Sequence, residues 1–101
     1  MTNYQIGFRF EHEVAQYYTK RGYLVIRAAG SHTPFDLLCL PLGEHLENNV
    51  LVMQLKRYTK YAAKPDDAFG LIPLPPNVTK IWITKRKGEK YNPEICNKII
   101  P

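Results

Sequence analysis

The sequence is poor in cysteine and has no long hydrophobic run. Two cysteines among 101 residues, Cys39 and Cys96, are too few for a disulfide framework. Cys39 lies in the apolar run "DLLCLP", where a buried thiol is the ordinary state. We therefore expect a reducing, intracellular and cytoplasmic environment. No apolar stretch approaches the roughly 18 residues of a transmembrane helix, and no basic-then-apolar leader opens the chain, so we expect neither a membrane span nor secretion.

The sequence also lacks internal repeats, low-complexity tracts and zinc-binding spacings. The three histidines, His12, His32 and His45, do not combine with either cysteine in any spacing typical of a zinc site. The spacings therefore argue against a zinc site. The length predicts a single domain over residues 1–101, with a small hydrophobic core.

Acidic residues are fewer than basic ones, and the two kinds are separated along the chain. The formal net charge is +5, with 14 Lys and Arg against 9 Asp and Glu. The basic residues fall mainly in two groups: Lys56, Arg57, Lys60 and Lys64, and then Lys80, Lys85, Arg86, Lys87 and Lys90. Such groups suit a polyanion, and nucleic acid is the commonest one inside a cell. A charge of this size is also usual in small soluble domains that bind no nucleic acid.

Hydrophobic periodicity predicts a helix over residues 5–21, ended by Gly22. The residues on its apolar stripe are Ile6, Phe10, Val14 and Tyr17 or Tyr18. Strands are expected at residues 23–27, 36–40, 50–56 and 80–84. Short helices are expected at residues 64–69 and from Asn92-Pro93 onward, the second with Ile95 and Ile99 on one side.

The connections between these elements predict how the strands pair. Short links favour an antiparallel meander of the first three strands, whereas the long link from Lys56 to Lys80 allows a crossover to a parallel fourth strand. The predicted fold class is α/β, a mixed β-sheet with the N-terminal helix packed on it.

Polar side chains gather near the ends of two expected strands. The stretch "VLVMQLK" (residues 50–56) begins apolar and ends with Gln54 and Lys56, which share one face because alternate strand residues point the same way. Antiparallel pairing brings Asp36, at the start of the preceding strand, beside them. Glu11 on the helix is within reach of the same edge. Oxygen ligands and a lysine together suit a Mg²⁺ ion that activates water for phosphodiester hydrolysis.

Each of these residues also has an ordinary structural explanation. Glu11 alone suits a solvated helix position, and Asp36 alone suits a turn after Pro34. Gln54 and Lys56 alone suit an exposed strand end. The occurrence of all four in this order is what favours a site.

Two kinds of aromatic residue need separate interpretation. Trp82, between isoleucines, is more typical of a core than of a base-stacking surface. Tyr58 and Tyr61 interleave with basic residues, which suits a DNA backbone with exposed bases, although simple surface exposure explains them equally well.

Taken in order, the motifs resemble those of the PD-(D/E)XK nucleases, and most closely the archaeal and archaeal-virus Holliday-junction resolvases. The matching stretches run from residue 5 to residue 60: "GFRFE" (7–11), "GYLVIR" (22–27), "AGS" (29–31), Asp36 and "QLK" (54–56). The resemblance implies a restriction-endonuclease-like mixed sheet. It also implies a Mg²⁺-dependent endonuclease, with Mn²⁺ as a substitute, that hydrolyses phosphodiesters in branched DNA.

The same resemblance implies a role for each residue. Glu11, Asp36 and Gln54 would be metal ligands, together with the backbone carbonyl of Leu55. Lys56 would act on the attacking water or on the phosphate. Residues expected to hold the DNA are Arg27 and Ser31, by the resemblance, and Arg57, Lys60 and Lys64, by their charge.

The sequence departs from the resolvase pattern at three places. Gln54 stands where a glutamate is usual, so Mg²⁺ affinity is expected to be lower and Gln54→Glu to raise it. His12 follows Glu11 where the resolvases often carry arginine. Residues 62–79 are too short and proline-rich for the long helix associated with resolvase dimers.

Two alternatives therefore stay open, a non-catalytic nucleic-acid-binding domain of the same fold and a related restriction or repair nuclease. A homodimer is expected, because a DNA junction has near two-fold symmetry and needs paired nicks. The expected interface residues are Phe69, Leu71, Ile72 and Leu74.

Overall fold

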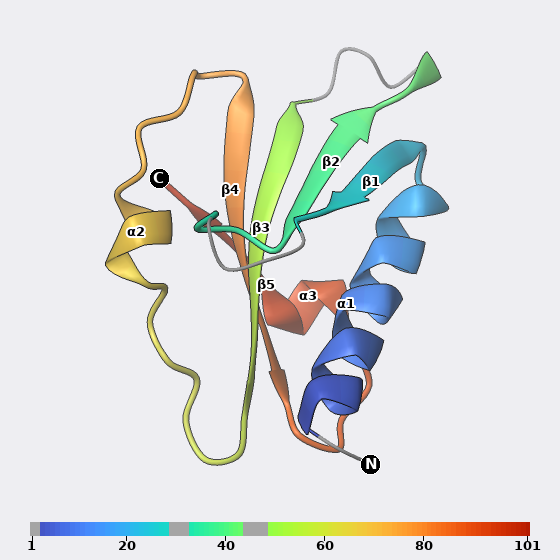
Figure 1. Cartoon of the computed structure of the whole chain (residues 1–101), viewed down its shortest axis with the longest axis vertical. Coiled ribbons are helices and arrows are strands. Elements are labelled where there is room, and N and C mark those ends of the chain that lie inside the picture. Colours follow the sequence, from blue (N-terminus) through green and yellow to red (C-terminus); the bar gives the residue numbers. More distant parts are fainter. Residues whose placement is uncertain (1–2, 29–32, 44–48) are drawn as a thin grey trace.

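The computed structural model describes residues 3–28, 33–43 and 49–101. Three strands follow the N-terminal helix directly, and two short helices lie between the later strands (Figure 1). In chain order they are α1 (Asn3–Thr19), β1 (Tyr23–Arg27), β2 (Leu37–Pro41), β3 (Val50–Tyr58), α2 (Asp67–Gly70), β4 (Val78–Arg86), α3 (Pro93–Cys96) and β5 (Asn97–Ile100). None of these helices is long and apolar enough to cross a membrane.

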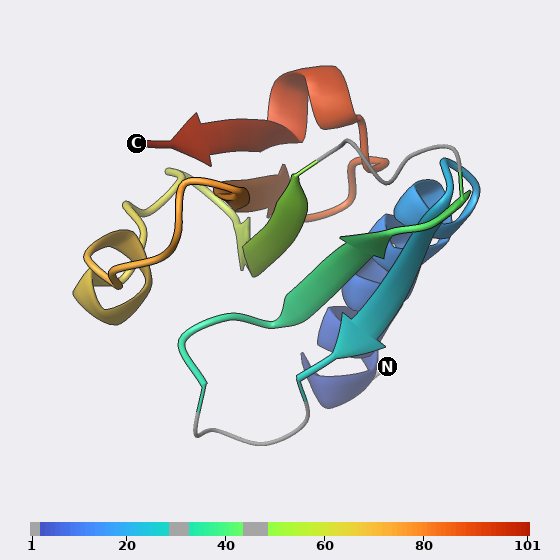
Figure 2. The same ribbon diagram turned by 90° about the horizontal axis from the view of Figure 1, so that it is seen from above.

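The strands form one open sheet in the order β1-β2-β3-β4-β5. The pairs β1–β2, β2–β3 and β4–β5 are antiparallel, and β3–β4 is parallel. The predicted meander and parallel crossover are therefore confirmed, as is the α/β class with the N-terminal helix packed on a mixed sheet. Figure 2 shows α1 and the crossover segment that contains α2 lying away from each other across this sheet.

The main hydrophobic core lies between α1 and one face of the sheet. Phe10, Val14 and Tyr18 form the buried stripe of α1, as their spacing predicted. They pack with side chains of β2, β3 and β4, chiefly Leu37, Cys39, Met53, Ile81 and Ile83. Cys39 is fully buried, and burial raises the pKa of its thiol to about 12, which makes it a neutral core residue. Gly22, with φ at 91°, ends the helical segment as predicted.

The opposite face of the sheet holds the crossover between β3 and β4. The indole Nε1 of Trp82 donates to the carbonyl of Ala63 at 3.1 Å, and Nζ of Lys80 donates to the carbonyl of Gly70 at 2.8 Å. Phe69 is fully buried and Trp82 is 5% exposed. The core role predicted for Trp82 is confirmed, whereas Phe69, expected at a dimer interface, lies inside the chain.

The C-terminal segment differs from its sequence prediction. Asn92 caps a helix as expected, its Oδ1 accepting from the N–H of Glu94 at 3.1 Å, but this helix is a single turn. Ile99, expected on the helix, pairs instead with Ile81 in the β4–β5 ladder. The reason is that β4 would otherwise be an edge strand with unpaired peptide groups, and the ladder satisfies them.

Several helix and strand boundaries also differ from the predicted ones. β3 and β4 are longer than predicted, because their parallel pairing continues from Val50↔Val78 to Tyr58↔Arg86. α2 begins at Asp67 instead of residue 64, since Asp66 is extended, with φ at −59° and ψ at 145°.

Candidate functional site

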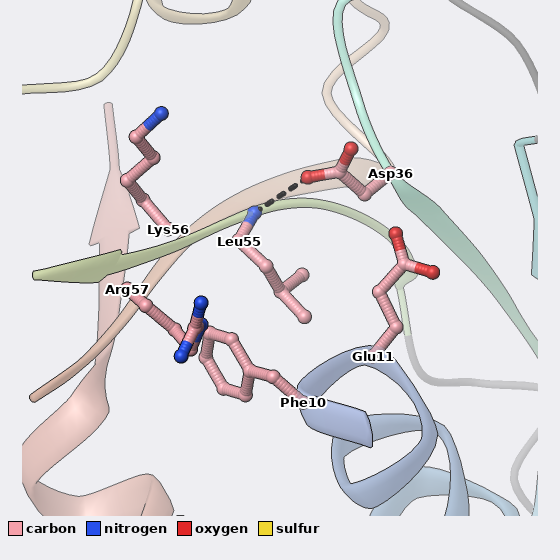
Figure 3. Close-up of a pocket in the computed structure, with 6 residues that line it drawn as sticks. All are labelled: Phe10, Glu11, Asp36, Leu55, Lys56 and Arg57. Atoms are coloured by element: carbon pink, nitrogen blue, oxygen red, sulfur yellow. Dashed lines mark hydrogen bonds between the residues drawn. The ribbon is translucent and has the colours of Figure 1, made fainter. Parts of the chain in front are cut away.

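An open pocket lies where β2 begins beside the end of β3. Its volume is about 250 Å³. It is lined by side chains from α1, from the start of β2 and from β3: Phe10, Glu11, Asp36, Leu55, Lys56 and Arg57 (Figure 3). Four of the residues expected at the site, Glu11, Asp36, Leu55 and Lys56, therefore meet at one place.

Asp36 joins the two strands at this corner. Its N–H donates to the carbonyl of Met53 at 2.7 Å, and its Oδ2 accepts from the N–H of Leu55 at 2.7 Å. Burial raises the pKa of the Asp36 carboxyl, and the nearby Asp66 adds to this. The Leu55 N–H, Lys56 and Arg27 oppose the rise. Asp36 is thus a partly desolvated acid whose ionised form a cation would favour.

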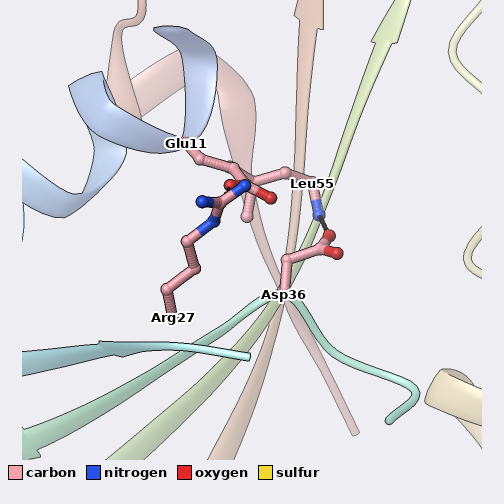
Figure 4. Close-up of polar contacts among 4 residues, drawn as sticks. All are labelled: Glu11, Arg27, Asp36 and Leu55. Atoms are coloured by element: carbon pink, nitrogen blue, oxygen red, sulfur yellow. Dashed lines mark hydrogen bonds and ion pairs between the residues drawn. The ribbon is translucent and has the colours of Figure 1, made fainter. Parts of the chain in front are cut away.

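Glu11 lies next to Asp36, with its side chain directed toward it (Figure 3), and is held by Arg27. Nε of Arg27 donates to Oε2 of Glu11 at 2.7 Å, and the two side chains are 43% and 23% exposed (Figure 4). The Arg27 guanidinium also lies over the ring of Phe8, 4.9 Å from its centroid. Arg27 therefore belongs to the site, but as the ionic partner of Glu11. Its predicted contact with a DNA phosphate stays a prediction.

Gln54 faces away from this pocket. Its Nε2 donates to Oδ2 of Asp66 at 3.0 Å, and its Oε1 accepts from the N–H of Asp66 at 3.4 Å. Gln54 lies on the crossover side of β3, because the alternate residues Met53 and Leu55 face the α1 core. The amide oxygen expected to bind the metal is thus engaged with Asp66.

Lys56 is exposed beside the pocket, and in Figure 3 its side chain points away from Glu11. Alternation along β3 places it on the same side as Gln54, as predicted.

The residues expected to hold DNA lie at different distances along the chain from the pocket, and only one of those that the structure describes lines it. Arg57 lines the pocket and also a neighbouring one with Tyr58, Thr59 and Lys87. Lys60 and Lys64 are exposed in the crossover. Ser31 lies outside the described residues.

The parallel register of β3 and β4 brings the two basic groups of the sequence together. Lys56 pairs with Thr84, Arg57 with Lys85, and Tyr58 with Arg86. The cationic ends of both strands therefore lie side by side, next to the pocket. Sequence reasoning could not foresee this, because the register of a crossover is not encoded locally.

The donor atoms at this pocket suit only a metal site with few protein ligands. Within residues 3–28, 33–43 and 49–101 there is no group of three or more His, Cys, Asp and Glu residues that could hold an ion. Glu11 and Asp36 supply two carboxylates, and the carbonyl of Leu55 faces the same edge as its N–H. Mg²⁺ commonly uses one or two protein carboxylates and takes its other oxygens from water and phosphate. The residues present fit such a site.

Asp66 is the residue that sequence reasoning missed. Its signal was weak, the first of two acids after Pro65 in an irregular segment, and only the folded chain brings it to Gln54.

No family model, curated protein or solved structure matched this chain. Function is therefore inferred from the geometry of the pocket and from the order of the motifs.

Proposed function

We propose that this protein is a metal-dependent DNA endonuclease with a restriction-endonuclease-like core. Its substrate would be branched DNA, as for a Holliday-junction resolvase. The observation that carries the proposal is the convergence of Glu11, Asp36, Leu55 and Lys56 at one pocket, from three separate parts of the chain.

Each residue of the pocket would have a separate role in hydrolysis. Asp36 and Glu11 would hold the ion, and the N–H of Leu55 keeps the Asp36 carboxylate in place. Mg²⁺ bound there would lower the pKa of a bound water and offset the charge that builds on the phosphate. The Lys56 ammonium would orient the attacking water or donate to a phosphate oxygen. Arg27 balances the charge of Glu11 and restrains its side chain.

Binding of DNA rests on the cationic strand ends beside the pocket. Arg57, Lys60 and Lys64 on one side and Arg86 and Lys87 on the other would contact phosphates. Such contacts carry affinity without sequence preference, which suits recognition of DNA by shape.

The test compares cleavage and binding in the same variants. Asp36→Asn and Lys56→Ala are expected to abolish cleavage of a four-way junction in Mg²⁺ while leaving binding within a few-fold, because phosphate contacts are spread over many residues. Asp67→Asn and Lys98→Ala are matched controls, since both residues are exposed and neither lines the pocket. Equal loss of binding and cleavage would mean that the fold was damaged.

A second candidate function is a non-catalytic nucleic-acid-binding domain. It is favoured by the pairing of Glu11 with Arg27 and by the neutral Gln54. Wild-type protein that binds junctions but cleaves none in Mg²⁺ or Mn²⁺ would support it. Preference for linear duplex would instead support a restriction or repair nuclease.

A further inference from the structure

The segment between β3 and α2 presents one large aromatic side chain to solvent. Tyr61 is 85% exposed, the highest value among the exposed large hydrophobic residues of the described chain. Its hydroxyl and ring have no hydrogen-bond or stacking partner among the described residues. Two lysines flank it, Lys60 and Lys64, and both are exposed. We call residues 59–64 the basic arm; Figure 1 shows this part of the chain leaving the end of β3 and turning toward α2.

The basic arm is anchored at both ends. At its start, the carbonyl of Tyr58 accepts from the N–H of Lys87 at 2.8 Å. At its end, the carbonyl of Ala63 accepts from the Trp82 indole at 3.1 Å. Just beyond, Asp66 is held by Gln54 through two hydrogen bonds. Tyr61 therefore projects from a short span whose ends are tied to β3 and β4.

The basic arm also lies close to the proposed hydrolytic pocket. Arg57, which lines the pocket, is four residues before Tyr61. Four residues of fully extended chain span no more than roughly 15 Å, which bounds the distance between their Cα atoms. A base at Tyr61 and a phosphate at the pocket can therefore belong to one DNA molecule.

We propose that Tyr61 stacks on an unpaired or splayed nucleobase of distorted DNA, while Lys60 and Lys64 contact the adjoining phosphates. An exposed aromatic ring between cations is the arrangement with which proteins bind single-stranded nucleic acid, because every base has a stacking face. Bases in a continuous duplex are not available to it. This inference rests on the proposed action on DNA and adds the feature by which distorted DNA is told from linear duplex.

The test measures binding without metal, so it does not depend on cleavage. Tyr61→Ala is expected to weaken binding to a four-way junction and to a duplex with a one-nucleotide bulge by roughly tenfold. Binding to linear duplex should change by less than about twofold, since its bases stay stacked. Tyr61→Phe keeps the ring and should bind like wild type. Leu71→Ala, which alters another exposed apolar residue of the crossover, is the matched control.

Two further readouts separate stacking from charge. A 2-aminopurine placed at the bulge should lose fluorescence on binding to wild type and to Tyr61→Phe, but not to Tyr61→Ala. Lys64→Ala should reduce the salt dependence of binding, whereas Tyr61→Ala should leave it unchanged.

The outcomes distinguish this inference from the proposed function. Equal losses on distorted and linear DNA, or no loss, would overturn stacking by Tyr61 and leave the nuclease proposal standing. A Tyr61→Phe variant as weak as Tyr61→Ala would also overturn it. If Tyr61→Ala weakens binding to distorted DNA alone and the wild type cleaves no DNA, stacking would be supported and the nuclease proposal overturned. Absence of any DNA binding by wild type would overturn both.

Discussion

At the scale of the residue, the pairing of Gln54 with Asp66 changes what a substitution at position 54 does. The amide donates through Nε2 to the carboxylate, and its Oε1 accepts from the Asp66 N–H. A glutamate would place an acceptor-only carboxylate against another carboxylate. The negative charge of a glutamate at position 54 would thus favour a cation near Asp36. The same charge would repel the Asp66 carboxylate of the crossover.

We therefore expect Gln54→Glu to lower the free energy of unfolding by about 1 kcal/mol, since the pair is largely exposed. Asp66→Asn in the same chain should restore most of that loss. The gain in Mg²⁺ affinity anticipated for the glutamate should be complete only in this double variant. Urea unfolding of the two single variants and the double variant, with Mg²⁺ titrations followed by thermal shift, measures both effects.

Additive effects of the two substitutions would contradict this coupling. Asp67→Asn is the control for Asp66→Asn, because it removes a neighbouring charge with no bond to Gln54.

At the scale of the element, the crossover between β3 and β4 is mostly irregular chain, held in place by side-chain hydrogen bonds from β4. Two side chains of that strand, Lys80 and Trp82, donate to carbonyls of Gly70 and Ala63. Phe69 of α2, in the same segment, is fully buried. A proline-rich segment that cannot form a regular helix is thereby ordered from outside.

We expect Trp82→Phe to loosen the basic arm selectively. Loss of the indole N–H removes the bond to Ala63, at a cost of about 1 kcal/mol, while most of the apolar volume is kept. Amide hydrogen exchange should speed up at residues 59–66 and stay slow in β3 and β4.

Ile81→Val is a suitable control, because it alters the neighbouring residue on the α1 face and leaves the crossover bonds intact. Uniform acceleration throughout the sheet in Trp82→Phe would show that the bond to Ala63 has no local role.

At the scale of the whole molecule, the open sheet leaves β1 as an outer strand. No other described strand pairs with its far side. On the face away from α1, Leu24 pairs with Leu40 and Ile26 with Leu38, and Leu24 and Ile26 are 46% and 42% exposed. Of the interface residues predicted from sequence, Phe69 is fully buried and Leu71 is 77% exposed.

The branched substrate that we propose has near two-fold symmetry and would call for two active sites, so a homodimer is expected in solution. With Phe69 inside the chain, β1 offers the better apolar contact between copies. Leu24→Glu should therefore give a monomer, while Leu71→Glu should leave the dimer intact. Light scattering at micromolar concentration measures this, and a monomeric wild type would count against both the dimer and the junction substrate.

The sequence alone determined the elements that depend on local chemistry. The apolar stripe of α1, the stop at Gly22 and the alternation in β3 each arise from residues close together in the chain. Connection lengths were enough to predict the antiparallel meander and the parallel crossover. The motif order was enough to predict that Glu11, Asp36 and Lys56 would meet.

Only the tertiary structure decided features that depend on partners far apart in the chain. Ile99 entered a strand because the edge of β4 was available, and Glu11 was paired with Arg27 by the packing of α1 beside β1. Strand alternation places Gln54 on the crossover side of β3, and only the fold brings Asp66, twelve residues later, to offer it both a donor and an acceptor there. Local propensity does not predict such contacts, because they contribute free energy only after folding has brought the two groups together.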